Sequence, residues 1–314
     1  MQMSLLNDIF QMVESPLNYT GGKFKLLPQI LPYFSTKIDI FVDLFCGGCN
    51  VGINVTAKKI LYNDLNERLL YLYNALKTLD KKTTFDWIYR IIDTYQLSLV
   101  SKYGYGYYQC ESNKGLSEYN RDRFLKMRKD FNLRTRDDNY YYILFYVMIV
   151  YSFNNQIRFN NKGEFNLPVG KRDFNKRMED KLSSFIDRLQ EQNCTFSCRD
   201  FRSFDFSGLS STDFVYVDPP YLITCATYNE QGGWDESAEF DLLAILDELT
   251  KNNIRFALSN VLRSKGKENS ILIDWVNKGK KNLKVIPLNH SYANSNYQTK
   301  NKLFSSEEVL IINY

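Results

Sequence analysis

The chain has 314 residues, 44% of them hydrophobic, which is enough for one large domain or two modest ones with a real core. No stretch reaches the roughly 18 consecutive apolar residues that a membrane span needs, and residues 1–12 lack the basic and then apolar order of a signal peptide. Six cysteines without dense, even spacing favour reduced thiols over a disulfide framework. These features predict a soluble cytoplasmic protein with no membrane partner, and a monomer by default.

The net charge of +4 is unevenly distributed along the chain. Residues 81–190 carry 20 Lys and Arg against 13 Asp and Glu, which leaves 20 against 23 elsewhere. A basic central segment flanked by slightly acidic segments is typical of an inserted nucleic-acid-binding region. A solvated charged face gives the same surplus, so charge alone leaves both interpretations open.

The first elements in chain order are two strand and helix units. Residues 41–45 predict a buried strand that ends in a glycine turn at 46–49, and an apolar pattern over 51–57 could open a helix. Residues 60–64 predict a second strand, followed by helical spacing over 66–79. Two such units in succession favour a parallel sheet.

The glycine turn and the carboxylate that ends the second strand indicate a nucleoside-bearing cofactor. The backbone of a glycine turn can approach a ligand closely, and Asp64 could take two ribose hydroxyls. The Gly47-Gly48 pair does not match the spaced dinucleotide fingerprint, and no phosphate-binding loop follows the strand, which disfavours NAD and ATP. Taken alone, Asp64 could equally be a solvated strand end.

The remaining elements suggest one sheet interrupted by an insertion. The middle is rich in Tyr, Arg and Asn and includes an apolar segment, 140–151, that predicts a buried helix. The C-terminal part returns to alternating elements, with helices near 240–249 and 270–276 and strands near 254–258, 283–287 and 308–313. We therefore expect a discontinuous sheet domain, 1–78 with 194–314, around an inserted domain, 79–193.

Asp218-Pro219-Pro220-Tyr221 follows the apolar run 214–217, which predicts a buried strand. Ligands of open α/β sheets bind outside the carboxyl ends of strands, and the two prolines hold the backbone rigidly there. A carboxylate and a fixed carbonyl can accept both hydrogens of an NH2 group, while a tyrosine ring can stack on a flat base. The motif predicts a pocket for a planar amine, although four such residues could also be a simple strand-ending turn.

Together these segments resemble the Dam family of DNA adenine-N6 methyltransferases, in its α-class arrangement. The segments occur in the family's order along most of the chain: Asn18–Lys23, Asp43–Gly48, Tyr62–Asn66, Phe153–Gly170 and Asp218–Tyr221. The resemblance implies an α/β fold, a Rossmann-like S-adenosylmethionine-dependent methyltransferase sheet. It makes 1–78 and 194–314 the catalytic domain, and 79–193 a mainly helical DNA target-recognition domain with a β-hairpin.

The resemblance also implies the cofactor and its contacts. S-adenosylmethionine is the expected methyl donor and S-adenosylhomocysteine the product, with no metal. Tyr19, where relatives carry tryptophan, and Lys23 would contact the methionine end. The other implied cofactor contacts are Phe45 and Gly47 in the turn, Asp64 on the ribose, Asp200 and Phe201 at the adenine, and Asp218.

The implied reaction gives a role to each residue of the Asp218–Tyr221 motif, which follows the predicted strand 214–217. The exocyclic nitrogen of adenine is a poor nucleophile, and Asp218 and the Pro219 carbonyl would accept its hydrogens so that its lone pair faces the methyl group. Tyr221 would stack on the base, which has to be flipped out of the duplex. The same pocket would suit cytosine N4, adenine in RNA or a protein glutamine, and a DNA-binding module without catalysis is the alternative of another class.

By the same resemblance, residues 153–170 would enter the major groove. Arg158 can bond a guanine edge and Phe153 could wedge into the vacated stack, with Asn154 and Pro168 beside them. Arg158 could instead contact a phosphate or a surface carboxylate. Gln156-Ile157 differs from the residues usual in GATC readers, which leaves GATC, CATG and other adenine-containing sites open.

Several further features receive no function. The pairs Cys46/Cys49 and Cys194/Cys198 argue little for zinc, because the first lies in the cofactor turn. His290 has no partner histidine, and the loop 291–305 has no assigned role. A restriction endonuclease acting on the same site is an expected partner, in a bacterial, archaeal or phage-infected cell, but a solitary role fits the sequence equally well.

Overall fold

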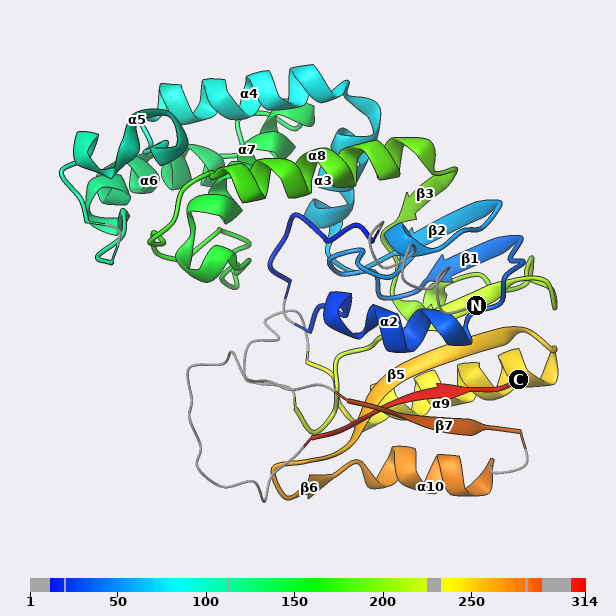
Figure 1. Cartoon of the computed structure of the whole chain (residues 1–314). Coiled ribbons are helices and arrows are strands. Elements are labelled where there is room, and N and C mark those ends of the chain that lie inside the picture. Colours follow the sequence, from blue (N-terminus) through cyan, green and yellow to red (C-terminus); the bar gives the residue numbers. More distant parts are fainter. Residues whose placement is uncertain (1–11, 20, 112, 225–232, 280–281, 290–305) are drawn as a thin grey trace. The chain divides into compact units, whose positions relative to one another are not determined.

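The computed structural model describes residues 12–19, 21–111, 113–224, 233–279, 282–289 and 306–314 (Figure 1). The chain divides into two compact units. The helical unit comprises Met1–Gly22 and Asn66–Gln192, and the sheet unit comprises Lys23–Leu65 and Asn193–Tyr314. Within the described ranges, no helix is long and apolar enough to cross a membrane.

The sheet unit is built on one sheet with strand order β3-β2-β1-β4-β5-β8-β7, and β6 pairs with β5. Its strands are β1 Ile40–Asp43, β2 Lys59–Asn63, β3 Cys194–Ser197, β4 Phe214–Val217, β5 Arg255–Ser264, β6 Lys267–Glu268, β7 Lys284–Leu288 and β8 Glu307–Ile312. The strands β3, β2, β1, β4 and β5 run parallel to one another, whereas β8 is antiparallel to both β5 and β7. This mainly parallel sheet confirms the predicted α/β, Rossmann-like fold class.

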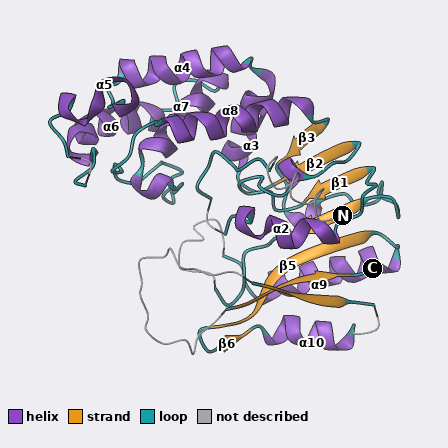
Figure 2. Cartoon of the chain, in the orientation of Figure 1, coloured by secondary structure: helices purple, strands orange, loops and turns teal. Residues whose placement is uncertain are grey.

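Both faces of the central strands are covered, as their apolar sequences require. On one face Val42 and Val215 belong to the core formed with α9 (Glu236–Lys251), and Figure 2 shows that helix beside β5. On the other face the Phe34 ring packs on Phe41 and Phe214, with centroids 5.7 and 4.8 Å apart. The other helical elements of this unit are η1 Phe24–Leu26, α2 Leu27–Ile30, η2 Leu31–Tyr33, η3 Gly52–Asn54, η5 Phe201–Ser203 and α10 Ser270–Lys278.

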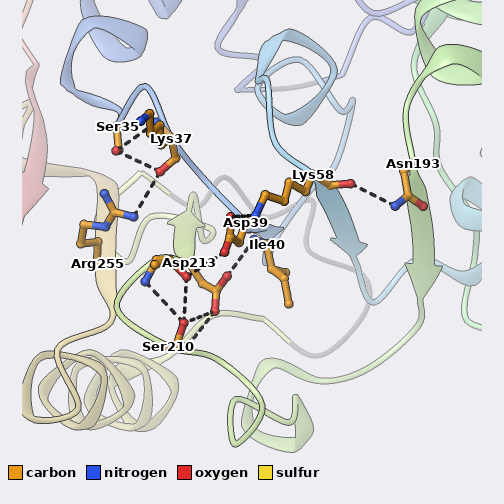
Figure 3. A network of polar contacts seen from close by, with 10 residues as sticks. Ser35, Lys37, Asp39, Ile40, Lys58, Asn193, Ser210, Asp213 and Arg255 are labelled. Atoms are coloured by element: carbon orange, nitrogen blue, oxygen red, sulfur yellow. Dashed lines mark hydrogen bonds and ion pairs between the residues drawn. The ribbon is translucent and has the colours of Figure 1, made fainter.

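Polar contacts tie together the amino-terminal ends of the parallel strands (Figure 3). The Ile40 amide donates to Asp213 Oδ1 at 2.7 Å, and Lys58 Nζ pairs with Asp39 Oδ1 at 2.7 Å. Asn193 donates to the Lys58 carbonyl at 3.0 Å. These contacts align β1, β2 and β4 at one edge of the sheet and leave their carboxyl ends to the opposite edge.

The helical unit is organised around α7 (Asn139–Tyr151), whose residues from Tyr141 onward are all buried. This confirms the buried helix that the apolar run predicted. The helices α3, α4 and α6 pack against it. The elements of this unit are α3 Glu67–Thr78, α4 Lys81–Thr94, α5 Val100–Tyr107, α6 Ser117–Asn132, α7, η4 Phe153–Asn155 and α8 Lys176–Glu191.

Two local features differ from the sequence-based expectations. The pattern over 51–57 forms only the short η3, and β2 begins soon afterwards at Lys59. The compact units divide at Leu65 and Asn66 rather than after residue 78, because α3 packs on α7 and α8. The division before Asn193 lies beside the expected one, and a further division between Gly22 and Lys23 groups Met1–Gly22 with the helical unit rather than with the sheet unit.

Candidate active site

The glycine turn after β1 and the carboxylate after β2 are in direct contact. The Gly47 amide donates to Asp64 Oδ2 at 2.8 Å, and the Cys46 amide donates to the Asn63 carbonyl at 2.8 Å. Gly47 has a φ of 45°, in the left-handed region that favours glycine. The parallel pairing of β1 with β2 therefore brings two of the predicted cofactor residues together, with Asp64 ordering the turn.

A second carboxylate, Asp43, lies buried at the end of β1. Its Oδ2 accepts the Gly52 amide at 3.0 Å, and a Cβ on Gly52 would stand 2.4 Å from Cε1 of Tyr62, so this position requires glycine. Burial raises the pKa of Asp43 to about 7, against the opposing effect of the Gly52 hydrogen bond. Asp43 was part of the recognised motif but was not among the predicted site residues.

Asp218 lies directly after β4 and binds two donors through one oxygen. Lys23 Nζ stands 2.9 Å from Asp218 Oδ1, and the Tyr221 hydroxyl donates to the same oxygen at 2.9 Å. Among the residues that the structure describes, none donates a hydrogen bond to Oδ2. Burial raises the pKa of Asp218, and Lys23 and the Tyr221 hydroxyl lower it in part. Lys23, Asp218 and Tyr221, predicted from separate motifs, thus form one cluster, with the buried Pro219 between the last two.

Glu308 completes this cluster from β8, and the sequence interpretation missed it. Its Oε1 lies 3.7 Å from Lys23 Nζ and 3.3 Å from the Tyr221 hydroxyl, whose single hydrogen it shares with Asp218. The ammonium of Lys23 also lies 5.0 Å from the centroid of the Tyr221 ring. The available signal was a carboxylate at the start of the apolar strand pattern 309–312.

Three aromatic rings from different segments gather beside the glycine turn. The centroids of Phe45 and Phe201 are 5.5 Å apart, and Trp234 lies 5.7 Å from the first and 5.3 Å from the second. Trp234 Nε1 donates to the buried Glu239 at 2.5 Å, which fixes the indole. Asp200 caps η5 and pairs with Arg202 at 3.2 Å. Phe45 and Phe201 were predicted and come together, whereas Trp234 was not predicted.

The four predicted DNA-contacting residues belong to one loop of the helical unit. The amide of the exposed Phe153 donates to the Pro168 carbonyl at 2.9 Å, and Asn154 has a left-handed φ of 55°. Its carbonyl accepts Asn18 Nδ2 at 2.8 Å. Arg158 Nε donates to Asn166 Oδ1 at 2.7 Å.

This loop turns back on itself as a hairpin does, but its pairing is limited to two isolated bridges, Ser152 with Val169 and Phe159 with Phe165. Backbone hydrogen bonds on either side of the second bridge join Asn160 to Glu164 and Asn166 to Arg158, at 2.9 and 3.1 Å. The outward-facing backbone of Phe165 is held by Asn132 of α6, which accepts its amide at 2.8 Å and donates to its carbonyl at 3.0 Å.

Some predicted features cannot be placed with the others. Tyr19 belongs to the helical unit, where its carbonyl accepts the Gly22 amide at 3.1 Å, and Thr20 lies outside the described residues. His290 and the loop 291–305 also lie outside them. In the described part of the chain, no group of three or more His, Cys, Asp or Glu side chains could hold a metal ion.

Comparison with known proteins decides the family. A model of the D12 class N6 adenine-specific DNA methyltransferases matches residues 19–294. The chain belongs to this family. Membership confirms the resemblance to Dam-type enzymes that the motifs suggested.

Curated relatives of this D12-class chain carry matching names. It is 42% identical over 308 residues to the modification methylase StsI of Streptococcus sanguinis and 41% identical over 308 residues to the type II methyltransferase M.FokI of Planomicrobium okeanokoites. Each alignment covers 96% of this chain but 43% of the relative, so the chain spans less than half of their length. It is 25% identical over 249 residues to the DNA adenine methylase of Salmonella typhi, covering 78% of this chain and 79% of that one.

Proposed function

We propose that the protein transfers a methyl group from S-adenosylmethionine to the N6 amino group of a flipped-out adenine in a short, specific site of double-stranded DNA. The observation that carries this proposal is the state of the Asp218 carboxylate. Lys23 and Tyr221 hold Oδ1 at 2.9 Å each, and no described residue donates to Oδ2. An N–H of the adenine amine would supply the missing donor.

The chemistry follows from that contact. Asp218 Oδ2 and the Pro219 carbonyl would each accept one amine hydrogen, so that the nitrogen lone pair leaves the plane of the ring. The nitrogen would then be placed to bond the methyl carbon of the donor, whose sulfur would keep the electron pair of the broken carbon–sulfur bond. The amine releases one proton to Asp218 or to solvent. Positioning and fixed electrostatics supply the rate, without a covalent enzyme intermediate.

The residues around the glycine turn suit S-adenosylmethionine, which supplies a methyl group activated on a positively charged sulfur. A carboxylate has about four acceptor positions, so Asp64 can hold the Gly47 amide and ribose hydroxyls together. Phe45 and Phe201, with Trp234 in contact with both rings, offer flat apolar surfaces for the adenine. We assign the methionine end to Tyr19 and Lys23 and an adenine contact to Asp200.

The helical unit is the proposed target-recognition region. Arg158 would read a guanine edge and Phe153 would fill the gap left by the flipped base, flanked by Asn154 and Pro168. Asn166 holds one side of the Arg158 guanidinium through Nε, which leaves the Nη1 donors to reach a base. The modification methylases among the relatives favour partnership with a restriction endonuclease, and we expect a monomer.

Methylation of DNA tests this proposal. Purified protein, labelled S-adenosylmethionine and unmethylated plasmid should yield N6-methyladenine at one recurring short sequence. Methylation at cytosine N4, or of RNA or protein alone, would assign the chemistry to another amine. No incorporation into any substrate by folded, cofactor-binding protein would favour a DNA-binding module without catalysis.

A further inference from the structure

A buried carboxylate outside the recognised motifs lies against the Asp218 cluster. The side chains of Lys23 and Glu308 are only 5% and 4% exposed, and their charged ends are 3.7 Å apart. We infer that Glu308 is a positioning residue for methyl transfer, which holds Lys23 and the Tyr221 hydroxyl against Oδ1 of Asp218. The inference rests on the proposed function, because it gives Glu308 its purpose in orienting the acceptor of the adenine amine.

Glu308 and Asp218 each lie within reach of the same two donors. Lys23 Nζ lies 2.9 Å from Asp218 and 3.7 Å from Glu308, and the Tyr221 hydroxyl lies 2.9 and 3.3 Å from the same two oxygens. A buried ammonium needs more than one acceptor to offset its lost hydration. Glu308 supplies an acceptor besides Asp218, so Lys23 can remain in place when a substrate amine approaches Asp218.

The backbone on both sides of this contact is fixed. Glu308 pairs with Val261 of β5 and with Leu288 of β7, in the interior of the sheet. The Lys23 carbonyl accepts the amides of Leu26 at 2.8 Å and Leu27 at 3.1 Å, where η1 and α2 begin. The rigid strand and the rigid helix start therefore hold Glu308 and Lys23 in register without help from a ligand.

Glu307 provides a matched control. It precedes Glu308 in β8, where successive side chains point to opposite faces, and it is 45% exposed and pairs with Arg263 at 2.9 Å. Glu308→Gln keeps the size of the side chain and removes its charge, and Glu307→Gln makes the same chemical change outside the cluster.

Kinetics with both variants test the positioning role. Glu308→Gln should lower kcat on the order of 10- to 100-fold, with a change in KM for S-adenosylmethionine of less than about threefold. Glu308→Asp should recover part of kcat, and Glu307→Gln should match the parent. In combination with Tyr221→Phe, Glu308→Gln should cost less than the product of the two single losses. Multiplicative losses, or equal kcat in the two glutamine variants, would overturn the inference.

Urea unfolding separates this inference from the proposed function. If Glu308 pairs with Lys23, Glu308→Gln and Lys23→Met together should change the unfolding equilibrium constant by less than the product of the single changes. This result requires no turnover, so a parent protein that fails to methylate DNA would refute the proposed function and still leave the contact tested. Independent effects of the two substitutions would refute the contact.

Discussion

Lys23 provides the positive charge that offsets the burial of Asp218. Burial raises the pKa of Asp218, and the ammonium 2.9 Å away acts in the opposite direction. In the proposed mechanism Asp218 has to be ionised, so that Oδ2 can accept an adenine amine hydrogen while Oδ1 holds Lys23 and the Tyr221 hydroxyl. The ionic state of this one carboxylate therefore links the structure of the cluster to the pH range of activity.

Replacing Lys23 should move that range. Lys23→Met removes the charge that lowers the pKa of Asp218, so the pKa rises further and the carboxylate protonates at a higher pH. We expect the acid limb of the profile of kcat/KM against pH to shift upward, while Lys25→Met, an exposed change in the 3-10 helix that follows Lys23, leaves it unchanged. An acid limb at the same pH in Lys23→Met would argue against control of Asp218 by Lys23.

Asp43 should make the stability of the protein depend on pH, and a single substitution can separate its contribution from those of other groups. Its pKa is raised from 3.8 to about 7 in the folded protein, so its contribution to stability is fully present below pH 3.8 and is lost as pH rises through about 7. Asp43→Asn keeps an acceptor for the Gly52 amide and removes this loss. In urea unfolding, the free energy of unfolding of the variant should rise relative to that of the parent between pH 4 and 7, by up to about 4 kcal/mol. A constant difference across that range would contradict the assignment.

At the scale of elements, the proposed recognition loop, residues 153–170, has a constrained backbone at its two ends and an arginine side chain that a neighbouring residue holds. Asn154 and Asn155 both have left-handed φ angles, of 55° and 54°. A Cβ on Gly170 would stand 2.3 Å from the Ser152 carbonyl oxygen, so close packing at the loop base excludes a side chain there. The loop therefore presents Phe153 and Arg158 from a backbone that other residues could not easily adopt.

Substitutions in this loop should change site choice more than chemistry. Arg158→Ala should relax or abolish the sequence preference, with a loss on the order of 1–3 kcal/mol in discrimination at one base pair. Asn166→Ala should act in the same direction but more weakly, because it only releases Arg158 Nε. Mapping N6-methyladenine across a plasmid measures both effects. An unchanged methylation pattern in Arg158→Ala would exclude base recognition by this residue.

The elements that sequence could predict are those with local patterns. The apolar run 214–217 followed by Asp218 predicted both a strand and the carboxylate at its end, and the glycine turn with Asp64 followed the same logic. The pattern over 51–57 misled because its apolar side chains are buried from a short 3-10 turn followed by extended backbone, and not from an α-helix. Glu308 and Trp234 were missed since they join the site only through tertiary packing, from segments without a recognisable motif.

At the scale of the whole molecule, the surplus of positive charge belongs to residues 81–190, which lie in the helical unit. Four basic residues follow the loop 153–170, and they differ in whether an acidic side chain lies beside them: Lys171, Arg172, Lys176 and Arg177. Lys176 pairs with Glu179 and Asp180, and Arg177 lies 3.9 Å from Glu14. Lys171 and Arg172 are exposed and are the stronger candidates for phosphate contacts.

The salt dependence of DNA binding should identify those contacts. Because each phosphate contact releases counterions, replacing both Lys171 and Arg172 by alanine should reduce the slope of log K against log salt by about 2. Replacing Lys176 and Arg177 should reduce it less, since acidic neighbours already offset their charges. Equal slopes for the parent and the first double variant would remove these two residues from the DNA interface.

The most direct measurement of the central claim compares Asp218→Ala with the parent in single-turnover methyl transfer and in calorimetric binding of S-adenosylmethionine. The parent should form N6-methyladenine. The variant should bind the cofactor with an affinity within about tenfold of the parent, and its rate of transfer should fall at least on the order of 1,000-fold, because the acceptor for the adenine amine is gone. Transfer by Asp218→Ala at a rate close to that of the parent would contradict the account.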